Sequence, residues 1–327
     1  MVALPVNPSR QPRGLADIRL AKLATGMGAI GVHETLILGW RRRVKTTRRK
    51  GQRNSRDVKG VRSARAARRG RAARYPDAGE AVGTVSLRAH IYHTGFWTIS
   101  GTFALLGTPT LLARDRGPVT GWLHAYTRAM RAWLKTCGVE VEYRGLEHLP
   151  EGPAVFAAKH QSYADGILHV AHKRDLAYVI GDHMLKFPLI GTYLERAEAV
   201  VVDDAAGKRA GDALETAIAR LKAQQRDILI FPEGGMAPVG GKKRYRRGVH
   251  RLASALERPV VPVATNLGCF WPRQEWRLHP GRAVIEYLPP LTPVEDRNHF
   301  RTLLERTIES RTRALEAEAH AAGRRKG

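Results

Sequence analysis

The chain has 327 residues, enough for one large domain with appendages or for two small domains. Its 55 Lys and Arg against 30 Asp and Glu give a net charge of +25, while 43% of the residues are hydrophobic, as in a globular protein. This charge indicates anionic partners such as nucleic acid, anionic lipid head groups or acidic proteins. Two cysteines far apart in sequence exclude a disulfide framework and a cysteine-rich zinc site, so we expect a reducing, cytoplasmic setting.

The first ninety residues carry most of the positive charge. They contain 21 Lys or Arg against 5 Asp or Glu, a net charge of +16. Residues 41–74 have too few large apolar side chains to offset the entropy cost of ordering the backbone. We therefore predict that residues 1–90 form a basic, disordered arm, without the apolar core of a secretory signal. The sequence leaves open whether the arm is genuine or whether the true start lies further downstream.

An uncharged stretch follows between Arg88 and Arg114. Within it, Gly95–Ala113 has the length of a membrane span, but threonines, glycines and a proline dilute its hydrophobicity. We predict a membrane-associated helical segment over 91–136, inserted or interfacial, and the alternative is a buried helix of a soluble fold. Residues 119–136 have the pattern of an amphipathic helix.

From residue 137 onward, apolar strand patterns alternate with helical patterns. This alternation predicts an α/β fold, with a central largely parallel or mixed sheet flanked by helices. We assign residues 137–293 to this domain and 294–327 to a charged surface helix and tail. Helices are also expected at 211–225 and 249–256. The predicted strands are Val139–Tyr143, Ala154–Ala158, Leu176–Ile180, Ala197–Val202, Asp227–Phe231, Val260–Ala264 and Ala283–Leu288.

His160 lies between a predicted strand and a predicted helix, a position that catalytic groups favour in open α/β sheets. Asp165 lies in the first helical turn, where its carboxylate can bind one imidazole nitrogen and leave the other to accept a proton. A histidine held in this way is a general base near neutral pH. Ser162 and Asp165 also match a capping box, in which the carboxylate only satisfies backbone donors. His169 and His172 share a helix face and are expected at the surface.

A second candidate segment, Phe-Pro-Glu-Gly-Gly, begins at Phe231 as another apolar strand ends. Its Glu233 and Gly234 are candidate site residues, although Pro and Gly often mark a plain turn. The basic run that follows suits a phosphate or an acidic carrier protein, but such runs are commonly solvated surfaces. It is not a P-loop, because Met236 stands where a glycine is needed. The basic residues predicted to bind substrate are Lys242, Lys243, Arg246 and Arg247.

Taken together, these segments resemble the lysophosphatidic acid acyltransferases and their glycerolipid relatives, in particular the bacterial branch. His160–Asp165 is similar to their His-x4-Asp block, Phe231–Gly234 to their Phe-Pro-Glu-Gly block, and Pro259–Asn266 to their Val-Pro-Val block. The order and spacing of the blocks also match. The resemblance covers residues 96–292.

The resemblance implies acyl transfer from a coenzyme A or acyl-carrier-protein thioester to the hydroxyl of a lysolipid, for which we expect 1-acyl-sn-glycerol-3-phosphate, in phospholipid biosynthesis. His160, oriented by Asp165, would deprotonate the hydroxyl, while Glu233 and Gly234 would shape the acceptor side and backbone donors would stabilise the oxyanion. No metal or cofactor is implied. The expected location is the cytoplasmic face of a bacterial inner membrane rich in anionic lipid, peripheral or single-span. No nucleic-acid partner is expected.

The sequence departs from the family pattern at two positions. Where the family has arginines associated with the acceptor phosphate, this chain has Asp204 and Met236. Lysophosphatidic acid is therefore predicted to be a poor acceptor, unless the run Lys242–Arg247 compensates. The alternatives are an acyltransferase for a lysolipid without a terminal phosphate, of the lyso-aminolipid type, or a catalytically inactive lipid-binding homologue. The intact His160 and Asp165 favour an enzyme.

Overall fold

The computed structural model describes residues 87–169, 175–187, 189–202, 208–273 and 278–324. The chain divides into two units, 1–76 and 77–327, and all described residues belong to the second. The predicted basic arm lies outside the described residues, except for 87–90, which begin the first helix.

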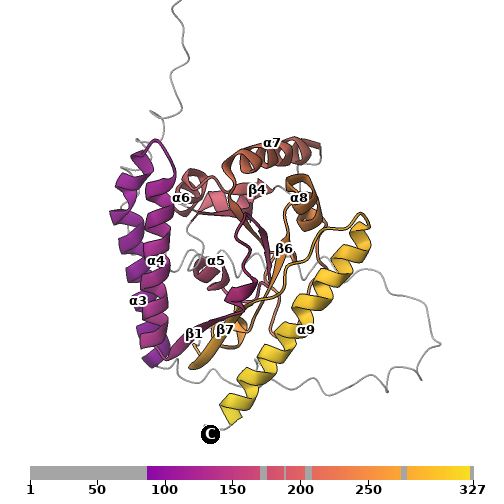
Figure 1. Cartoon of the computed structure of the whole chain (residues 1–327). Coiled ribbons are helices and arrows are strands. Elements are labelled where there is room, and N and C mark those ends of the chain that lie inside the picture. The colour runs from indigo at the N-terminus through magenta and orange to yellow at the C-terminus, as the bar shows by residue number, and fades with distance from the viewer. Residues whose placement is uncertain (1–86, 170–174, 188, 203–207, 274–277, 325–327) are drawn as a thin grey trace, which may run out of the picture. The chain divides into compact units, whose positions relative to one another are not determined.

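The described residues form one seven-stranded sheet with helices on both faces (Figure 1). The strands are β1 (Val139–Arg144), β2 (Val155–Ala158), β3 (Leu176–Gly181), β4 (Val200–Val202), β5 (Asp227–Ile230), β6 (Val260–Thr265) and β7 (Gly281–Tyr287). The α-helices are α3 (Leu87–Leu106), α4 (Gly117–Thr136), α5 (Asp165–Leu168), α6 (Ile190–Arg196), α7 (Lys208–Gln224), α8 (Gly248–Leu256) and α9 (Arg297–Arg324). The 3₁₀ helices are η1 (Thr108–Leu112), η2 (Leu146–His148), η4 (Asp182–Lys186) and η5 (Leu267–Cys269).

The strand order is β1-β7-β6-β2-β5-β3-β4, and every neighbouring pair is parallel except β6 and β7. The sheet is therefore mixed, and the predicted α/β fold is confirmed. The predicted strand at 197–202 is shorter than expected. Ala197 is the C-cap of α6 and Glu198 has a φ of 56°, so strand pairing begins only at Val200.

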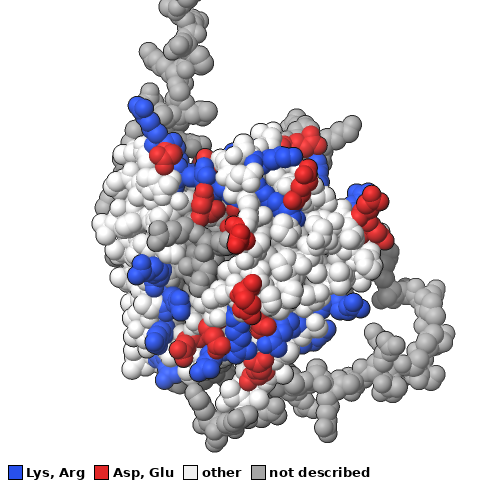
Figure 2. All heavy atoms as spheres, in the orientation of Figure 1, with Lys and Arg blue, Asp and Glu red and all other residues white. Residues whose placement is uncertain are grey.

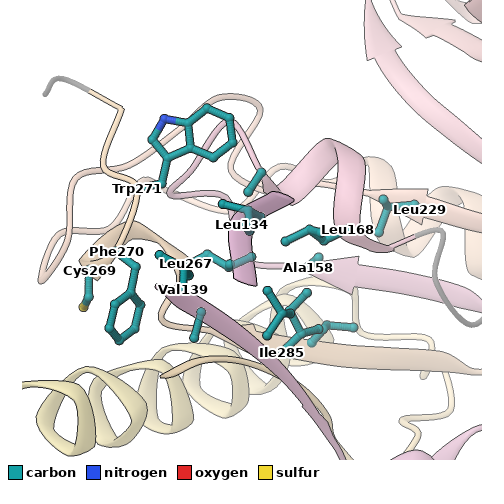
Figure 3. Close-up of a cluster of buried hydrophobic side chains, with 14 of the residues drawn as sticks. Leu134, Val139, Ala158, Leu168, Leu229, Leu267, Cys269, Phe270, Trp271 and Ile285 are labelled. Carbon is teal, nitrogen blue, oxygen red and sulfur yellow. The ribbon is translucent and has the colours of Figure 1, made fainter. Parts of the chain in front are cut away.

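The central strands are buried on both faces, which explains their continuous apolar sequence. In β2, Phe156 and Ala158 point into a cluster that includes Leu134 of α4 and Leu168 of α5 (Figure 3). The alternate residues Val155 and Ala157 join a second cluster with side chains of α8 and α9. Because helices cover both faces, residues at the strand ends are the ones available for chemistry.

The predicted membrane segment 95–113 is divided between α3 and η1, with the break at Gly107 before Pro109. Helix α3 lies beside α4 (Figure 1). Tyr92 and Phe96 of α3 pack edge-on against Trp271, with ring centroids 5.1 and 5.2 Å away. Within the described part of the chain, no helix is both long and apolar enough to cross a membrane.

Helix α9 corrects the predicted domain boundary at 293. It runs along the sheet (Figure 1), contacts β6 and β7, and is not a separate surface helix. Its apolar face is buried, because Phe300, Leu304, Ile308 and Leu315 recur at helical spacing. The domain that holds the candidate site therefore includes this helix.

Candidate active site

The two sequence segments with candidate residues meet at one edge of the sheet. Strands β2 and β5 are parallel neighbours, so their carboxyl ends lie side by side. The segment 159–165 follows β2 and the segment 231–236 follows β5. The backbone N–H of Ala237 donates to the carbonyl oxygen of His160 at 2.7 Å, which joins the two segments directly.

Asp165 holds His160 and also satisfies the turn before the helix. Its Oδ2 lies 3.0 Å from His160 Nδ1 and accepts the backbone N–H groups of Gln161 and Ser162 at 2.7 and 2.8 Å. Because a carboxylate only accepts, Nδ1–H donates and Nε2 is left as an acceptor. The Asp165 side chain is fully buried, whereas that of His160 is 18% exposed. Both interpretations of Asp165, backbone capping and imidazole orientation, therefore hold at once.

Two histidines lie against the same aromatic ring. His160 stacks on Phe231, with ring centroids 4.1 Å apart and planes at 18°, and the His169 ring lies 6.1 Å from Phe231. His169 is buried, so the predicted surface position is wrong, and His172 lies outside the described residues. Burial lowers the pKa of His169 to about 4, although Asp165 opposes the shift. This imidazole is therefore neutral near pH 7.

The buried side chain of Glu233 links the two segments through an ion pair and hydrogen bonds. Its Oε1 lies 3.0 Å from Lys159 Nζ and accepts the backbone N–H of His160 at 3.4 Å. Its Oε2 accepts the backbone N–H of Lys243 at 3.0 Å. Burial raises the pKa of Glu233, while the Lys159 ammonium opposes this shift. The carboxylate thus fixes the position of the His160 backbone.

Gly234 allows cationic side chains to approach the turn after Glu233. Its φ is +63°, and a Cβ there would lie 2.2 Å from Nε of Arg246. A Cβ at Gly235 would lie 3.1 Å from Lys243 Nζ. Arg246 and Lys243 are exposed residues whose side chains lie over the two glycines. The structure thus places two predicted substrate-binding cations beside the turn that carries Glu233.

The other two predicted binders point elsewhere. Lys242 Nζ lies 2.5 Å from Glu305 of α9 in an ion pair. Arg247 lines a separate surface cavity with Arg251 and Arg297. The basic run is therefore divided by the fold, and only Lys243 and Arg246 lie beside the glycine turn.

Sequence reasoning missed several residues of this site. Lys159 is fully buried, and Glu309 of α9 accepts from it at 2.7 Å. The Tyr245 hydroxyl donates to the same Glu309 at 3.1 Å. Arg273 donates to the carbonyl oxygen of Met236 at 3.3 Å, whereas Asp204 lies outside the described residues. The only sequence signal for Glu309 was its place on the apolar face of α9.

Three comparisons relate the chain to known proteins. A family model described as Acyltransferase matches residues 140–266. The 1-acyl-sn-glycerol-3-phosphate acyltransferase of Pseudomonas aeruginosa is 32% identical over 195 residues, 58% of this chain and 74% of that protein. The alpha form from Bos taurus is 30% identical over 161 residues, 47% of this chain and 55% of that protein. The fold is similar to that of the 1-acyl-sn-glycerophosphate acyltransferase PlsC of Thermotoga maritima, with a TM-score of 0.56 and 23% identity, covering 71% of this chain and 94% of that chain.

Proposed function

The chain belongs to the 1-acyl-sn-glycerol-3-phosphate acyltransferase family and is an acyltransferase, and from this premise we propose that it acylates lysophosphatidic acid. The observation that carries the proposal is the 3.0 Å hydrogen bond between His160 and the buried Asp165. This bond leaves Nε2 of a partly exposed imidazole ready to take a proton. The free hydroxyl of the acceptor is the group that needs such a base.

The proposed reaction is direct transfer. His160 Nε2 takes the proton of the acceptor hydroxyl while the oxygen of that hydroxyl attacks the carbonyl carbon of the thioester. The new C–O bond forms, the C–S bond breaks, and the thiolate leaves with the proton from the imidazolium. Asp165 stabilises the imidazolium, and general-base assistance of this kind contributes about 100-fold to 10,000-fold to the rate. The donor is an acyl-CoA or an acylated acyl carrier protein, and no further cofactor takes part.

We propose that Lys243 and Arg246 hold the acceptor phosphate. They lie over Gly234 and Gly235, beside Met236, where the family arginine is missing. Charge-assisted hydrogen bonds contribute about 1.5–3 kcal/mol each, so two such cations can replace the missing arginines. This favours lysophosphatidic acid over an acceptor without phosphate, the second candidate that Met236 had suggested.

We further propose that the protein attaches peripherally to the cytoplasmic face of a membrane through α3 and η1. Large apolar side chains are exposed there, with Leu105 and Leu106 each 65% exposed and Leu112 86% exposed. The outer flank over α3 carries few charged side chains in Figure 2. Apolar side chains at the end of a helix that has no Lys, Arg, Asp or Glu after Arg88 suit the interface of a bilayer, where a lysolipid acceptor resides.

The test is an acyl-transfer assay of the full-length protein in detergent. Lysophosphatidic acid is compared with a lyso-aminolipid, each with acyl-CoA and with acylated acyl carrier protein as donor. We expect transfer to lysophosphatidic acid with at least one donor, and a smaller kcat/KM for the acceptor without phosphate. A reversed preference would support the second candidate. Absence of transfer to every acceptor would indicate an inactive lipid-binding homologue.

A further inference from the structure

Helix α9 brings two buried carboxylates to the site. Glu309 and Glu316 are 4% and 6% exposed, although most charged residues of this helix face solvent. They are seven residues apart, which places them on one face of an α-helix, two turns from each other. Glutamate is almost never buried without a partner, because losing its hydration costs several kcal/mol. Both carboxylates therefore have specific partners.

These partners are the two neighbours of His160 in the chain. Lys159 Nζ donates to Glu309 Oε1 at 2.7 Å, and Gln161 Nε2 donates to Glu316 Oε1 at 2.7 Å. The side chains of Lys159 and Gln161 are themselves buried. The residues on either side of His160 are thus anchored to one helix, more than a hundred residues away in sequence.

The same carboxylates also bind the segment that carries the cations. Glu316 Oε1 accepts the backbone N–H of Gly240 at 3.1 Å, and Lys159 Nζ donates to the carbonyl oxygen of Gly241 at 3.0 Å. The Tyr245 hydroxyl donates to Glu309 at 3.1 Å, and burial together with Glu309 raises the pKa of Tyr245, which keeps this hydroxyl protonated. One helix face thus holds both sides of the site.

We propose that Glu309 and Glu316 are positioning residues that fix His160 relative to Lys243 and Arg246. This inference rests on the proposed function, and it extends the site beyond the residues 140–266 that the family model matches. Neither carboxylate touches the reacting atoms. They act through Lys159 and Gln161, whose backbones lead into and out of His160. Small displacements of a catalytic group slow the chemical step strongly, because alignment with the reacting atoms is lost.

The experiment compares Glu309→Gln and Glu316→Gln with the matched control Glu318→Gln. Glu318 lies on the same helix, but its side chain is 45% exposed and pairs with Arg144 and Arg311, away from His160. For each full-length variant, kcat, KM for lysophosphatidic acid and the thermal midpoint are measured. We expect kcat to fall about 10-fold in the two site variants with KM nearly unchanged. The control keeps its kcat.

A readout without turnover separates this inference from the proposed function. Histidine-selective ¹H–¹⁵N NMR follows the Nδ1–H signal of His160, assigned by its loss in His160→Gln. We expect this signal to shift in Glu309→Gln and Glu316→Gln but not in Glu318→Gln. If Glu309→Gln fails to fold, Tyr245→Phe removes a single hydrogen bond to Glu309 and takes its place.

Two outcomes overturn the inference. In one, the variants lose thermal stability while kcat and the His160 signal stay as in the wild type, which means that α9 only stabilises the fold. In the other, all three variants, including Glu318→Gln, lose the same activity, which means that the effect is not specific to the site. A wild type that transfers no acyl group contradicts the proposed function instead, and the NMR result then decides the positioning role separately.

Discussion

The segment after β2 and the segment after β5 both carry charged residues, but the fold treats them differently. In 159–165, Lys159 and Asp165 are buried and hydrogen bonded, and the His160 side chain between them is 18% exposed. In 231–247, Glu233 is buried, but Lys243 and Arg246 are exposed over a glycine turn. The first segment is held by the protein. The second carries exposed cations, which we propose hold the acceptor phosphate.

This difference teaches that charge in a sequence motif has two separate uses. A buried ion needs protein partners because it has lost its hydration, so a buried charged residue in a motif indicates a role in holding neighbouring residues in position. An exposed cation keeps its hydration until a ligand displaces the water, so an exposed cation in a motif indicates a role in binding an anionic ligand. Substitutions in the two segments should therefore change different kinetic constants.

The largest effect is expected in the first segment. His160→Ala removes the base but little packing, and should lower kcat by about 100-fold or more with little change in the thermal midpoint. Turnover and thermal unfolding are measured on the same preparation. If the variant keeps more than about a tenth of the wild-type rate, His160 is not the general base.

The second segment should respond through binding. The double variant Lys243→Gln with Arg246→Gln should lower kcat/KM for lysophosphatidic acid by about 100-fold, mainly through KM, because two charge-assisted contacts are lost. Efficiency toward a lyso-aminolipid should change little. Lys242→Gln is the matched control, since Lys242 pairs with Glu305 and not with the glycine turn. Equal losses for both acceptors would contradict phosphate binding by these cations.

His169, which is buried close to this segment, should make the free energy of unfolding depend on pH. Its pKa is about 4 in the folded protein against 6.5 as the ordinary value, so the unfolded chain takes up a proton first as pH falls. Above pH 6.5 the imidazole is neutral in both the folded and the unfolded chain, so its titration does not lower the free energy of unfolding. As pH falls from 6.5 toward 4, the unfolded chain is protonated and the folded chain is not, so the free energy of unfolding falls. Between pH 6.5 and 5 this amounts to about 2 kcal/mol. His169→Gln should lower the pH dependence of the unfolding free energy by this amount, measured by denaturant titration.

The smallest effect on catalysis is expected where charge is abundant but not placed at the site. Deleting residues 1–85 removes most of the net charge of +16 that residues 1–90 carry. Binding to anionic vesicles should weaken, and the difference should fade as salt rises, because exposed charges are screened within about 10 Å at 0.1 M. Turnover in detergent should stay close to wild type. A loss of turnover or of folding would mean that the domain boundary lies earlier in the chain.

The sequence by itself determined the strands and the chemistry at their ends. Val155–Ala158, Asp227–Ile230 and Val260–Thr265 are recognisable because strands buried on both faces read as continuous apolar runs. His160 and Asp165 are recognisable because a contact across five positions depends on local backbone geometry alone. Sequence periodicity and short spacings carry such information directly.

The tertiary structure alone decided which charged residues serve the site. Lys159 and Glu309 are 150 residues apart, and no sequence pattern around either residue predicts that the two side chains pair. In the basic run, Lys242 pairs with Glu305 of α9, Arg247 lines a surface cavity, and Lys243 and Arg246 lie over the glycine turn. The side chains differ in this way because successive residues of the backbone point toward different neighbours. Partners of this kind depend on how the elements pack, and packing sums contacts over the whole domain.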